Sequence, residues 1–176
     1  ALISLARAGA KPGKEMNRLI LEGLFTTVTN VNFNSETLED MISKVDSELS
    51  GIAGNAGVHA IHYDMNKLWN ADEDIRSLKS LILFGIRGVA AYAYHAMVLD
   101  YTDESVNNFF YKALSAIGED YGMEELLPIV MEVGQVNLTC MELLDKANTE
   151  TFGTPVPTTV PMTVAKGPFI VITGHD

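Results

Sequence analysis

Apolar positions recur at helical spacing over one long stretch of the chain, from Glu73 to Leu99. At about 100° per residue they fall in one wide sector of a helix, which is about 40 Å long at about 1.5 Å per residue. Asn70 and Asp72 are the expected N-caps of this helix. Because the apolar sector is wide, we expect a mostly buried helix with neighbours on several sides. The sector comprises Ile75, Leu78, Leu81, Ile82, Ile86, Val89, Ala90, Ala93 and Met97.

The same spacing predicts further helices, joined by short turns. Ser35 and Thr102 are the expected N-caps of two of them, because a hydroxyl group can accept backbone N–H groups at a helix start. The glycines between Gly51 and Gly57 predict a break after one of the helices. The predicted helices span residues 1–10, 14–27, 36–52, 58–69, 103–117 and 123–147.

An internal repeat relates the two halves of the chain. A shift of 88 residues places Leu38 on Leu126, and a shift of 90 residues places Asn17 on Asn107. The helix over residues 36–52 should bury Leu38, Met41, Ile42, Val45, Leu49 and Ile52. The helix over residues 123–147 should bury Leu126, Ile129, Val130, Val133, Cys140, Met141 and Leu144. Short turns make neighbouring helices antiparallel, so each copy reads as a three-helix bundle.

The repeat predicts an all-α fold of two three-helix bundles, in which the first copy lacks most of its leading helix. The pattern then changes, because proline and threonine dominate residues 148–166 and predict a loop. Residues 169–173, FIVIT, predict a short strand of a buried type. One strand cannot form a sheet, so we assign it to a missing α/β domain. The expected division is a truncated first bundle over 1–57, a second bundle over 58–147, and a linker with the strand over 148–176.

The amino-acid composition and net charge limit the classes of molecule that the chain is expected to bind. The chain has 176 residues, 47% of them hydrophobic, and a formal net charge of −11. An acidic chain without a basic cluster argues against nucleic acids and anionic membranes as partners. The apolar window over residues 80–99 is long enough to span a bilayer, but Arg87 lies near its middle. A central arginine costs roughly 2.5–3.5 kcal/mol on insertion scales, so we interpret the window as a buried helix of a soluble protein.

Cys140 is the one cysteine of the chain. A single thiol excludes a disulfide framework and a multi-thiolate metal site within these residues. A chain with a single cysteine fits a reducing compartment, and we expect a cytoplasmic protein. Since Cys140 holds a core position of its predicted helix, we expect a buried and inert thiol.

Several other residues could carry chemistry, but their spacing favours structural roles. The glycines Gly51, Gly54 and Gly57 follow no strand and include no lysine, so a phosphate loop is disfavoured. The cluster of His59, His62 and Asp64 lacks further metal ligands and reads as solvated surface. His95 lies on the polar edge of the long helix, where we expect a partly buried, hydrogen-bonded histidine.

The last residues are the strongest candidates for chemistry. Gly174, His175 and Asp176 follow the predicted strand directly. The carboxyl end of a core strand is where α/β sheets place ligands, and histidine is a common metal ligand and acid–base group. From spacing alone, a functional role for His175 and a purely structural one both stay open.

Five segments together resemble one family, in order and over nearly the whole chain. The resemblance is to the hybrid cluster protein, also called hydroxylamine reductase or prismane protein. The segments are 24–33 (LFTTVTNVNF), 74–79 (DIRSLK), 88–96 (GVAAYAYHA), 144–155 (LDKANTETFGTP) and 167–176 (GPFIVITGHD).

This resemblance implies a helical domain of two three-helix bundles, followed by two α/β domains. It implies two-electron reduction of hydroxylamine to ammonia and water, with reduction of nitric oxide and a part in nitrosative stress also attributed to the family. The implied cofactors are a cubane-type iron–sulfur cluster and a hybrid iron–sulfur–oxygen cluster. The histidine of the family's Gly-His-Asp motif is an iron ligand of the hybrid cluster, and that position is His175 in this chain.

The family's four-cysteine motif and its other cluster ligands are absent from these residues. Because an iron–sulfur cluster needs several thiolates, we expect the chain alone to hold no cluster, to be inactive and to serve a structural role. The full-length protein would use hydroxylamine or nitric oxide and a redox partner, and residues 148–176 would pack on the bundles or on a second copy. The alternative is a free-standing all-α interaction module without catalysis.

Overall fold

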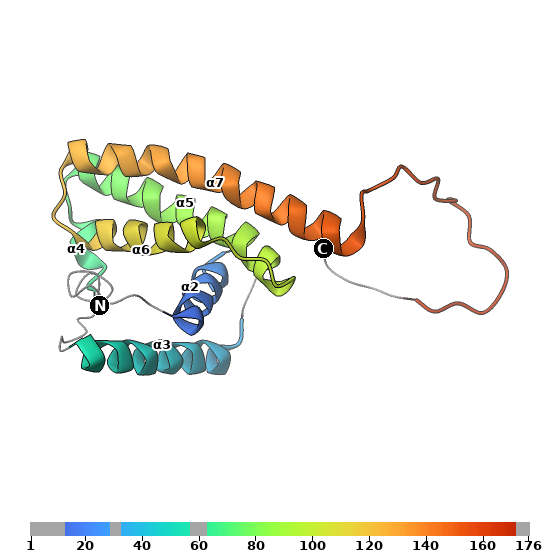
Figure 1. The fold of residues 1–176 in the computed structure, drawn as a ribbon, viewed down its shortest axis with the longest axis horizontal. Coiled ribbons are helices and arrows are strands. Elements are labelled where there is room, and N and C mark those ends of the chain that lie inside the picture. Colours follow the sequence, from blue (N-terminus) through green and yellow to red (C-terminus); the bar gives the residue numbers. More distant parts are fainter. Residues whose placement is uncertain (1–12, 29–32, 57–62, 172–176) are drawn as a thin grey trace.

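The structure, a computed structural model, describes residues 13–28, 33–56 and 63–171. The regular secondary structure in these ranges is helical, and they contain no strand, so the all-α prediction is confirmed for them (Figure 1). The predicted helix over residues 1–10 lies outside them. The helices are α2 (Lys14–Thr26), α3 (Ser35–Ala56), α4 (Asn66–Trp69), α5 (Glu73–Val98), α6 (Glu104–Gly118) and α7 (Met123–Phe152).

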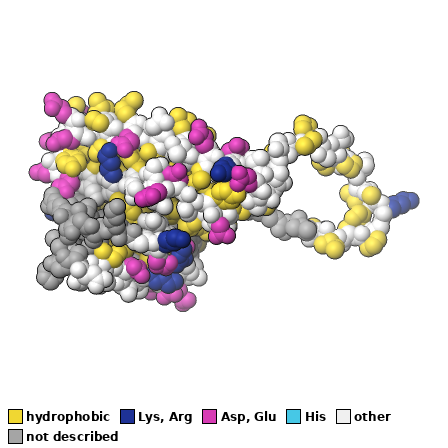
Figure 2. All heavy atoms as spheres, in the orientation of Figure 1, with side chains coloured by type: hydrophobic (Ala, Val, Ile, Leu, Met, Phe, Trp, Pro, Cys, Tyr) yellow, Lys and Arg dark blue, Asp and Glu magenta, His cyan; other side chains and the backbone are white. Residues whose placement is uncertain are grey.

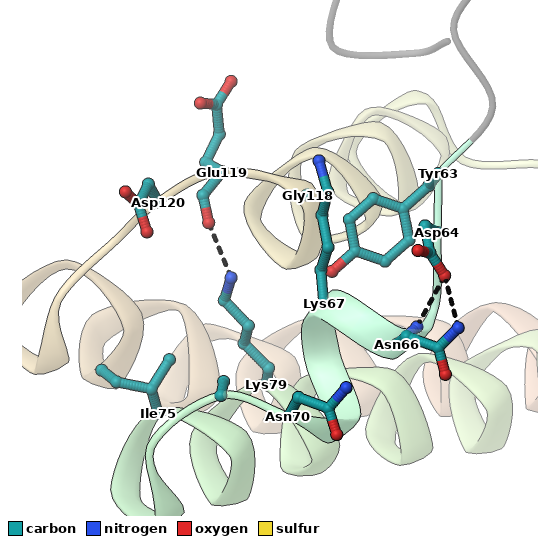
Figure 3. A pocket seen from close by; sticks show the side chains of 11 residues that line it. Tyr63, Asp64, Asn66, Lys67, Asn70, Ile75, Lys79, Gly118, Glu119 and Asp120 are labelled. Atoms are coloured by element: carbon teal, nitrogen blue, oxygen red, sulfur yellow. Dashed lines mark hydrogen bonds between the residues drawn. The ribbon is translucent and has the colours of Figure 1, made fainter.

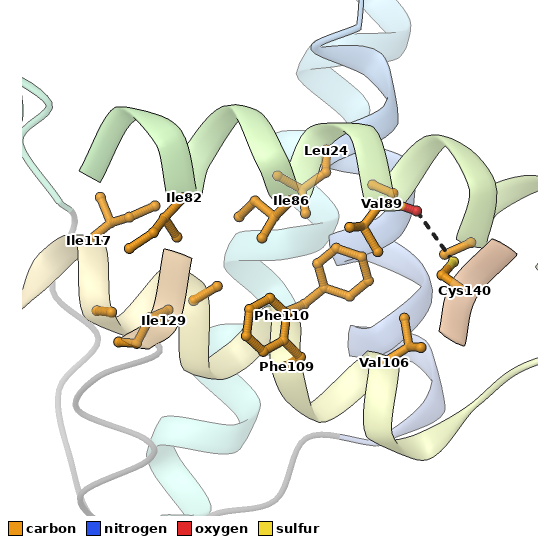
Figure 4. Packing of buried hydrophobic residues seen from close by; sticks show 14 of the residues in the cluster. Leu24, Ile82, Ile86, Val89, Val106, Phe109, Phe110, Ile117, Ile129 and Cys140 are labelled. Atoms are coloured by element: carbon orange, nitrogen blue, oxygen red, sulfur yellow. Dashed lines mark hydrogen bonds between the residues drawn. The ribbon is translucent and has the colours of Figure 1, made fainter. Parts of the chain in front are cut away.

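Helices α5, α6 and α7 run side by side and share the main core with α2 (Figure 1). Phe110 of α6 is fully buried in this core, to which α5 contributes Ile86 and α7 contributes Ile129 (Figure 4). Burying side chains from five helices in one cluster, with α4 contributing Leu68, removes much apolar surface from water and stabilises the fold. The buried members are Leu21, Leu24, Leu68, Ile82, Ile86, Val89, Ala90, Ala93, Val106, Phe109, Phe110, Ala113, Ala116, Ile117, Leu126, Ile129 and Cys140.

Helix α3 packs against α2, across a much smaller core. Met16 of α2 is buried there with Leu49 and Ala53 of α3. Tyr111 of α6 packs at the edge of this cluster, and its hydroxyl lies 2.5 Å from Oδ1 of Asn17. This contact links α2 to the main bundle.

Two N-caps differ from the sequence prediction. Oδ1 of Asp103, and not the hydroxyl of Thr102, accepts the backbone N–H groups of Ser105 and Val106 at the start of α6. Likewise Oδ1 of Asn34, and not the side chain of Ser35, accepts the N–H groups at the start of α3. Adjacent capping residues compete, and the register of the first turn decides which side chain reaches the free N–H groups.

Helix bounds also differ where the chain was expected to break. Helix α3 continues through Gly51 and Gly54 to Ala56, so the predicted break does not start at Gly51. Helix α7 runs to Phe152, five residues beyond the predicted end at Ala147. Glycine lowers helix propensity by only about 1 kcal/mol, which a longer packed helix tolerates. The short helix predicted over 58–69 is seen as α4, with residues 58–62 outside the described ranges.

Some burial predictions were wrong in detail. Leu81 is 56% exposed, Ile42 is 61% exposed and Met141 is 44% exposed, although each lies in a predicted apolar face. Lys79 is 7% exposed, although no pattern marked it as a core residue. The periodicity located the apolar face of each helix, but which part of that face is covered depends on the neighbouring helices.

Residues 153–171 form an extended, exposed arm beyond α7 (Figure 1). Phe169, Ile170 and Val171 are exposed and are not in a strand, so the strand prediction is unsupported in the part that the structure describes. A strand needs a partner for its backbone N–H and C=O groups, and the described residues offer none at this place. The rest of the predicted strand lies outside the described ranges, and the division into two bundles and a linker stays a prediction.

Helices α5 and α7 are both long and apolar enough to cross a membrane, judged by length and composition within the described ranges. The core helix of a soluble protein passes the same test. About a third of the most apolar window of α5 is buried against the rest of the molecule.

Candidate functional site

The residue expected to bind iron, His175, lies outside the described residues, as do His59 and His62. Its assignment as a ligand of the hybrid cluster therefore stays a prediction. Asp64, the third member of the expected surface cluster, is exposed and accepts a hydrogen bond from the backbone N–H of Asn66 at 2.9 Å.

Cys140 is fully buried between α5 and α7 (Figure 4). Its Sγ lies 3.6 Å from the carbonyl oxygen of Val89, to which the thiol can donate. Burial raises the pKa of this thiol to about 11, and the charge of Asp103 acts in the same direction. A thiol that stays protonated at neutral pH is a poor nucleophile and a poor metal ligand. The prediction of a buried cysteine is confirmed, and the raised pKa agrees with an inert role.

His95 is exposed on α5, and not partly buried as expected. Its ring meets Phe25 of α2 edge-on, with 5.6 Å between ring centroids. Phe25 in turn stacks on Tyr94 at 4.2 Å. The crossing of α2 over α5 therefore forms an aromatic contact and leaves the His95 side chain on the surface.

The glycines Gly51 and Gly54 lie inside α3. A phosphate loop needs backbone N–H groups that are free of helical hydrogen bonds and point at the anion. Their position in the helix therefore agrees with the sequence argument against a phosphate site, and Gly57 lies outside the described residues.

A polar pocket of about 650 Å³ lies where α4 and the start of α5 meet the turn between α6 and α7 (Figure 3). Its walls combine acidic, amide and basic side chains with one phenol. The lining residues are Tyr63, Asp64, Asn66, Lys67, Asn70, Ala71, Ile75, Lys79, Gly118, Glu119 and Asp120.

Two side chains in this pocket bind the carboxyl end of α6. The Nζ of Lys79 donates to the carbonyl oxygen of Glu119 at 2.6 Å, and the phenol of Tyr63 donates to that of Ile117 at 3.2 Å. Burial lowers the pKa of Lys79, although the charges of Asp120 and Glu119 oppose this shift. Burial also raises the pKa of Tyr63. Cations and donors stabilise a helix carboxyl end, so both groups serve to anchor α6.

The apolar pattern of the sequence did not mark Lys79 as a buried residue, although one signal was present. Lys79 stands four residues after Ile75 and three before Ile82, in the direction of the apolar face. A lysine at such a place buries its aliphatic stem and needs an acceptor for its ammonium group. The acceptor lies 40 residues away in the sequence, which a periodicity argument cannot locate.

The described residues do not fit an iron–sulfur cluster. They contain no group of three or more histidine, cysteine, aspartate or glutamate side chains that could hold a metal ion. The cysteine among them is buried, with a raised pKa, whereas a cluster needs several ionised thiolates.

The sequence matches the Prismane/CO dehydrogenase family over residues 1–176. Similar curated proteins include three named hydroxylamine reductases. The one from Chlorobaculum tepidum is 41% identical over 94% of this chain and 34% of its own length. The one from Maridesulfovibrio salexigens is 37% identical over 98% of this chain and 36% of its own length. The one from Methanosarcina mazei is 35% identical over 91% of this chain and 33% of its own length.

The chain spans about a third of the length of the curated relatives it matches. The family match covers every residue of the chain, including the segments that lie outside the described ranges. The helical fold, the ordered sequence motifs and this match agree, and the chain belongs to the Prismane/CO dehydrogenase family.

Proposed function

We propose that this chain is the helical part of a hydroxylamine reductase. The supporting observation is its 35–41% identity, over more than nine-tenths of its length, to proteins of that name. In the proposed reaction, hydroxylamine takes up two electrons and two protons, its N–O bond breaks, and ammonia and water form. The electrons come from a redox partner of the full-length protein.

Within that enzyme the chain serves a structural role, and it has no reductase activity by itself. We propose a structural role because the described residues contain no set of side chains that fits an iron–sulfur cluster. The main core and the anchored end of α6 make α5–α7 a rigid support. In the full-length protein, cubane and hybrid clusters bound elsewhere supply the redox chemistry, and His175 is the candidate iron ligand within this chain.

The test compares the full-length gene product with the 176-residue chain, both purified without oxygen. Iron and acid-labile sulfide are measured in each, together with hydroxylamine-dependent oxidation of a reduced viologen dye. We expect iron, sulfide and activity in the full-length protein and none in the short chain. A full-length protein without iron would overturn the cluster assignment and favour an all-α interaction module.

A variant of the full-length protein tests His175 separately. His175→Ala should lower hydroxylamine reduction and change the spectrum of the iron centre, while His95→Ala should change neither. Because His95 is an exposed histidine of the same chain, it is a matched control. Equal activity and spectra in both variants would remove His175 from the site.

The acidic net charge of −11 bears on the partners of the protein. A strongly acidic surface disfavours binding to nucleic acids and anionic lipids, so neither is a proposed partner. We place the full-length protein in the cytoplasm, where reducing conditions preserve thiolate-bound clusters.

A further inference from the structure

An apolar face runs along α5 and α7, on the side turned away from the main core. Phe84 of α5 is 53% exposed, while Met131 and Leu138 of α7 are 70% and 55% exposed. Spacings of three and eight residues in α5, and of three, four and seven in α7, place each set on one side of its helix. The exposed apolar members are Leu81, Phe84 and Tyr92 of α5, and Met123, Leu127, Met131, Leu138 and Met141 of α7.

A groove of about 510 Å³ lies between the two helices on this face. Its lining is mostly apolar and combines two aromatic rings with small residues, while one asparagine side chain and one tyrosine hydroxyl are polar. The lining residues are Phe84, Gly85, Gly88, Ala91, Tyr92, Val133, Gly134 and Asn137. A groove lined by small residues allows another backbone to approach closely.

The glycines of the groove divide into two kinds. A Cβ atom on Gly85 would lie 2.5 Å from Cγ1 of Val133, so Gly85 is needed for the close packing of α5 on α7. A Cβ atom on Gly88 or on Gly134 would meet nothing within 4 Å. Glycine weakens a helix interior relative to alanine, and contacts within the described residues do not explain these two. A segment seated in the groove would explain them.

Two observations identify the occupant. The chain spans about a third of its relatives' length, so a reductase of that size has about two thirds of its polypeptide to place against this domain. A second copy is disfavoured, because each copy carries a net charge of −11 and association would bring these charges together. A tethered segment also has a high effective concentration, which favours the intramolecular contact.

We propose that the α5–α7 groove is the docking surface for the part of the same reductase polypeptide that lies outside residues 1–176. The inference rests on the proposed function, because it takes this chain as one third of the enzyme. Hydrophobic side chains are also exposed along the arm beyond α7 (Figure 2). Val160, Met162 and Val164 are among them, so this apolar surface too is free for the rest of the polypeptide to cover. The docked segment contacts Met131 and Leu138 through apolar side chains.

Photocrosslinking in the full-length protein tests this surface. Met131 is replaced with p-benzoylphenylalanine, and Lys44 on the exposed side of α3 receives the same residue as a control. Irradiation should join position 131 to a peptide from outside residues 1–176 in a product of monomeric mass. A product of twice that mass, joined between two copies, would overturn the proposal. A yield no higher than that of the Lys44 control would also overturn it.

A second measurement uses two leucine substitutions one residue apart. Gly134→Leu fills the groove, whereas Gln135→Leu places the same side chain at an exposed position of α7 outside the groove lining. In the full-length protein, we expect Gly134→Leu to lower the thermal midpoint by several degrees and Gln135→Leu to leave it nearly unchanged. If the groove is open to water, Gly134→Leu should instead raise the midpoint, because leucine favours helix formation.

The two proposals fail in different ways. A full-length protein that reduces hydroxylamine but gives no specific crosslink at position 131 would overturn only the docking surface. One that gives the expected crosslink but contains no iron and has no activity would overturn only the proposed function.

Discussion

Helices α3 and α7 hold corresponding places in the internal repeat, yet their surroundings differ. Leu126 of α7 is fully buried between α5 and α6, while Leu38, 88 residues earlier in α3, is only half-buried. Ile129 is likewise buried, and its counterpart Met41 is half-buried. Helix α7 packs on two neighbouring helices, α5 and α6, whereas α3 packs mainly on α2.

The helices that precede them do not show this difference. Met16 and Leu19 of α2 are as deeply buried as Val106 and Phe109, their counterparts 90 residues later in α6. Helix α2 reaches this burial by packing on two helices, on α5 of the second copy and on α3, whose Leu49 and Ala53 are buried with Met16. Two helices with the same apolar pattern are therefore equally buried only where each packs on at least two other helices.

The largest effect is expected for a pair of substitutions that truncate corresponding leucines of α7 and α3. Leu126→Ala should lower the free energy of unfolding by about 4 kcal/mol, because it leaves a cavity in the main core. Leu38→Ala should cost only about 1 kcal/mol, since its side chain is already partly exposed to water. Denaturant unfolding followed by circular dichroism measures both losses, and equal losses would contradict the difference in packing.

The pH dependence of unfolding tests how well the main core excludes water. Well below pH 9, the Cys140 thiol is protonated in both the folded and the unfolded chain. Between pH 9 and about 11 only the unfolded chain ionises, because burial raises the folded pKa to about 11. Stability should therefore fall by about 2–3 kcal/mol over this range.

Cys140→Ala should remove that part of the pH dependence. Ile52→Ala is the matched control, because Ile52 holds the corresponding position in α3 and does not titrate. Unfolding curves at pH 8, 9, 10 and 11 supply the measurement. An unchanged slope in Cys140→Ala would assign the pH dependence to the tyrosines.

The carboxyl ends of α6 and α2 offer a third comparison. The carbonyl of Glu119 after α6 accepts from the distant Lys79, whereas that of Leu24 in α2 accepts from the hydroxyl of the neighbouring Thr27. Lys79→Met should cost about 2 kcal/mol, because it removes a charged donor. Thr27→Val should cost about 0.5–1 kcal/mol. Chemical denaturation measures both, and a smaller loss for Lys79→Met would reverse the expected order.

The smallest expected effects concern the two N-caps. Asp103→Ala should lower stability by about 1 kcal/mol, because its carboxylate accepts two backbone N–H groups and favours the helix dipole. Asn34→Ala should lose about 0.5 kcal/mol, since the neutral amide lacks the charge and α3 is less firmly packed. Thermal midpoints of the two variants rank them, and the opposite ranking would show that α3 is the better-anchored helix.

Sequence reasoning located the helices and the deepest core positions with few errors. The bounds of α5 differ by only one residue from the prediction. Its wide apolar sector and its acidic first turn are features of the local sequence, so they mark the helix without knowledge of its neighbours. The N-caps predicted at Thr102 and Ser35 were wrong, because the neighbouring Asp103 and Asn34 accept the free N–H groups instead. For the candidate site, the burial of Cys140 was predictable and the pocket around Lys79 was not. The assignment of His175 remains a prediction.

The sequence by itself determined the helical periodicity, the internal repeat and the family, because each of these is a pattern of residue types along the chain. Only the tertiary structure decided that α2 packs on α5 and that Lys79 binds the end of α6. It also decided that Leu81 and Met131 remain on the surface. The physical reason is that burial depends on contacts between residues far apart in the sequence, and the local pattern of one helix does not specify its neighbours.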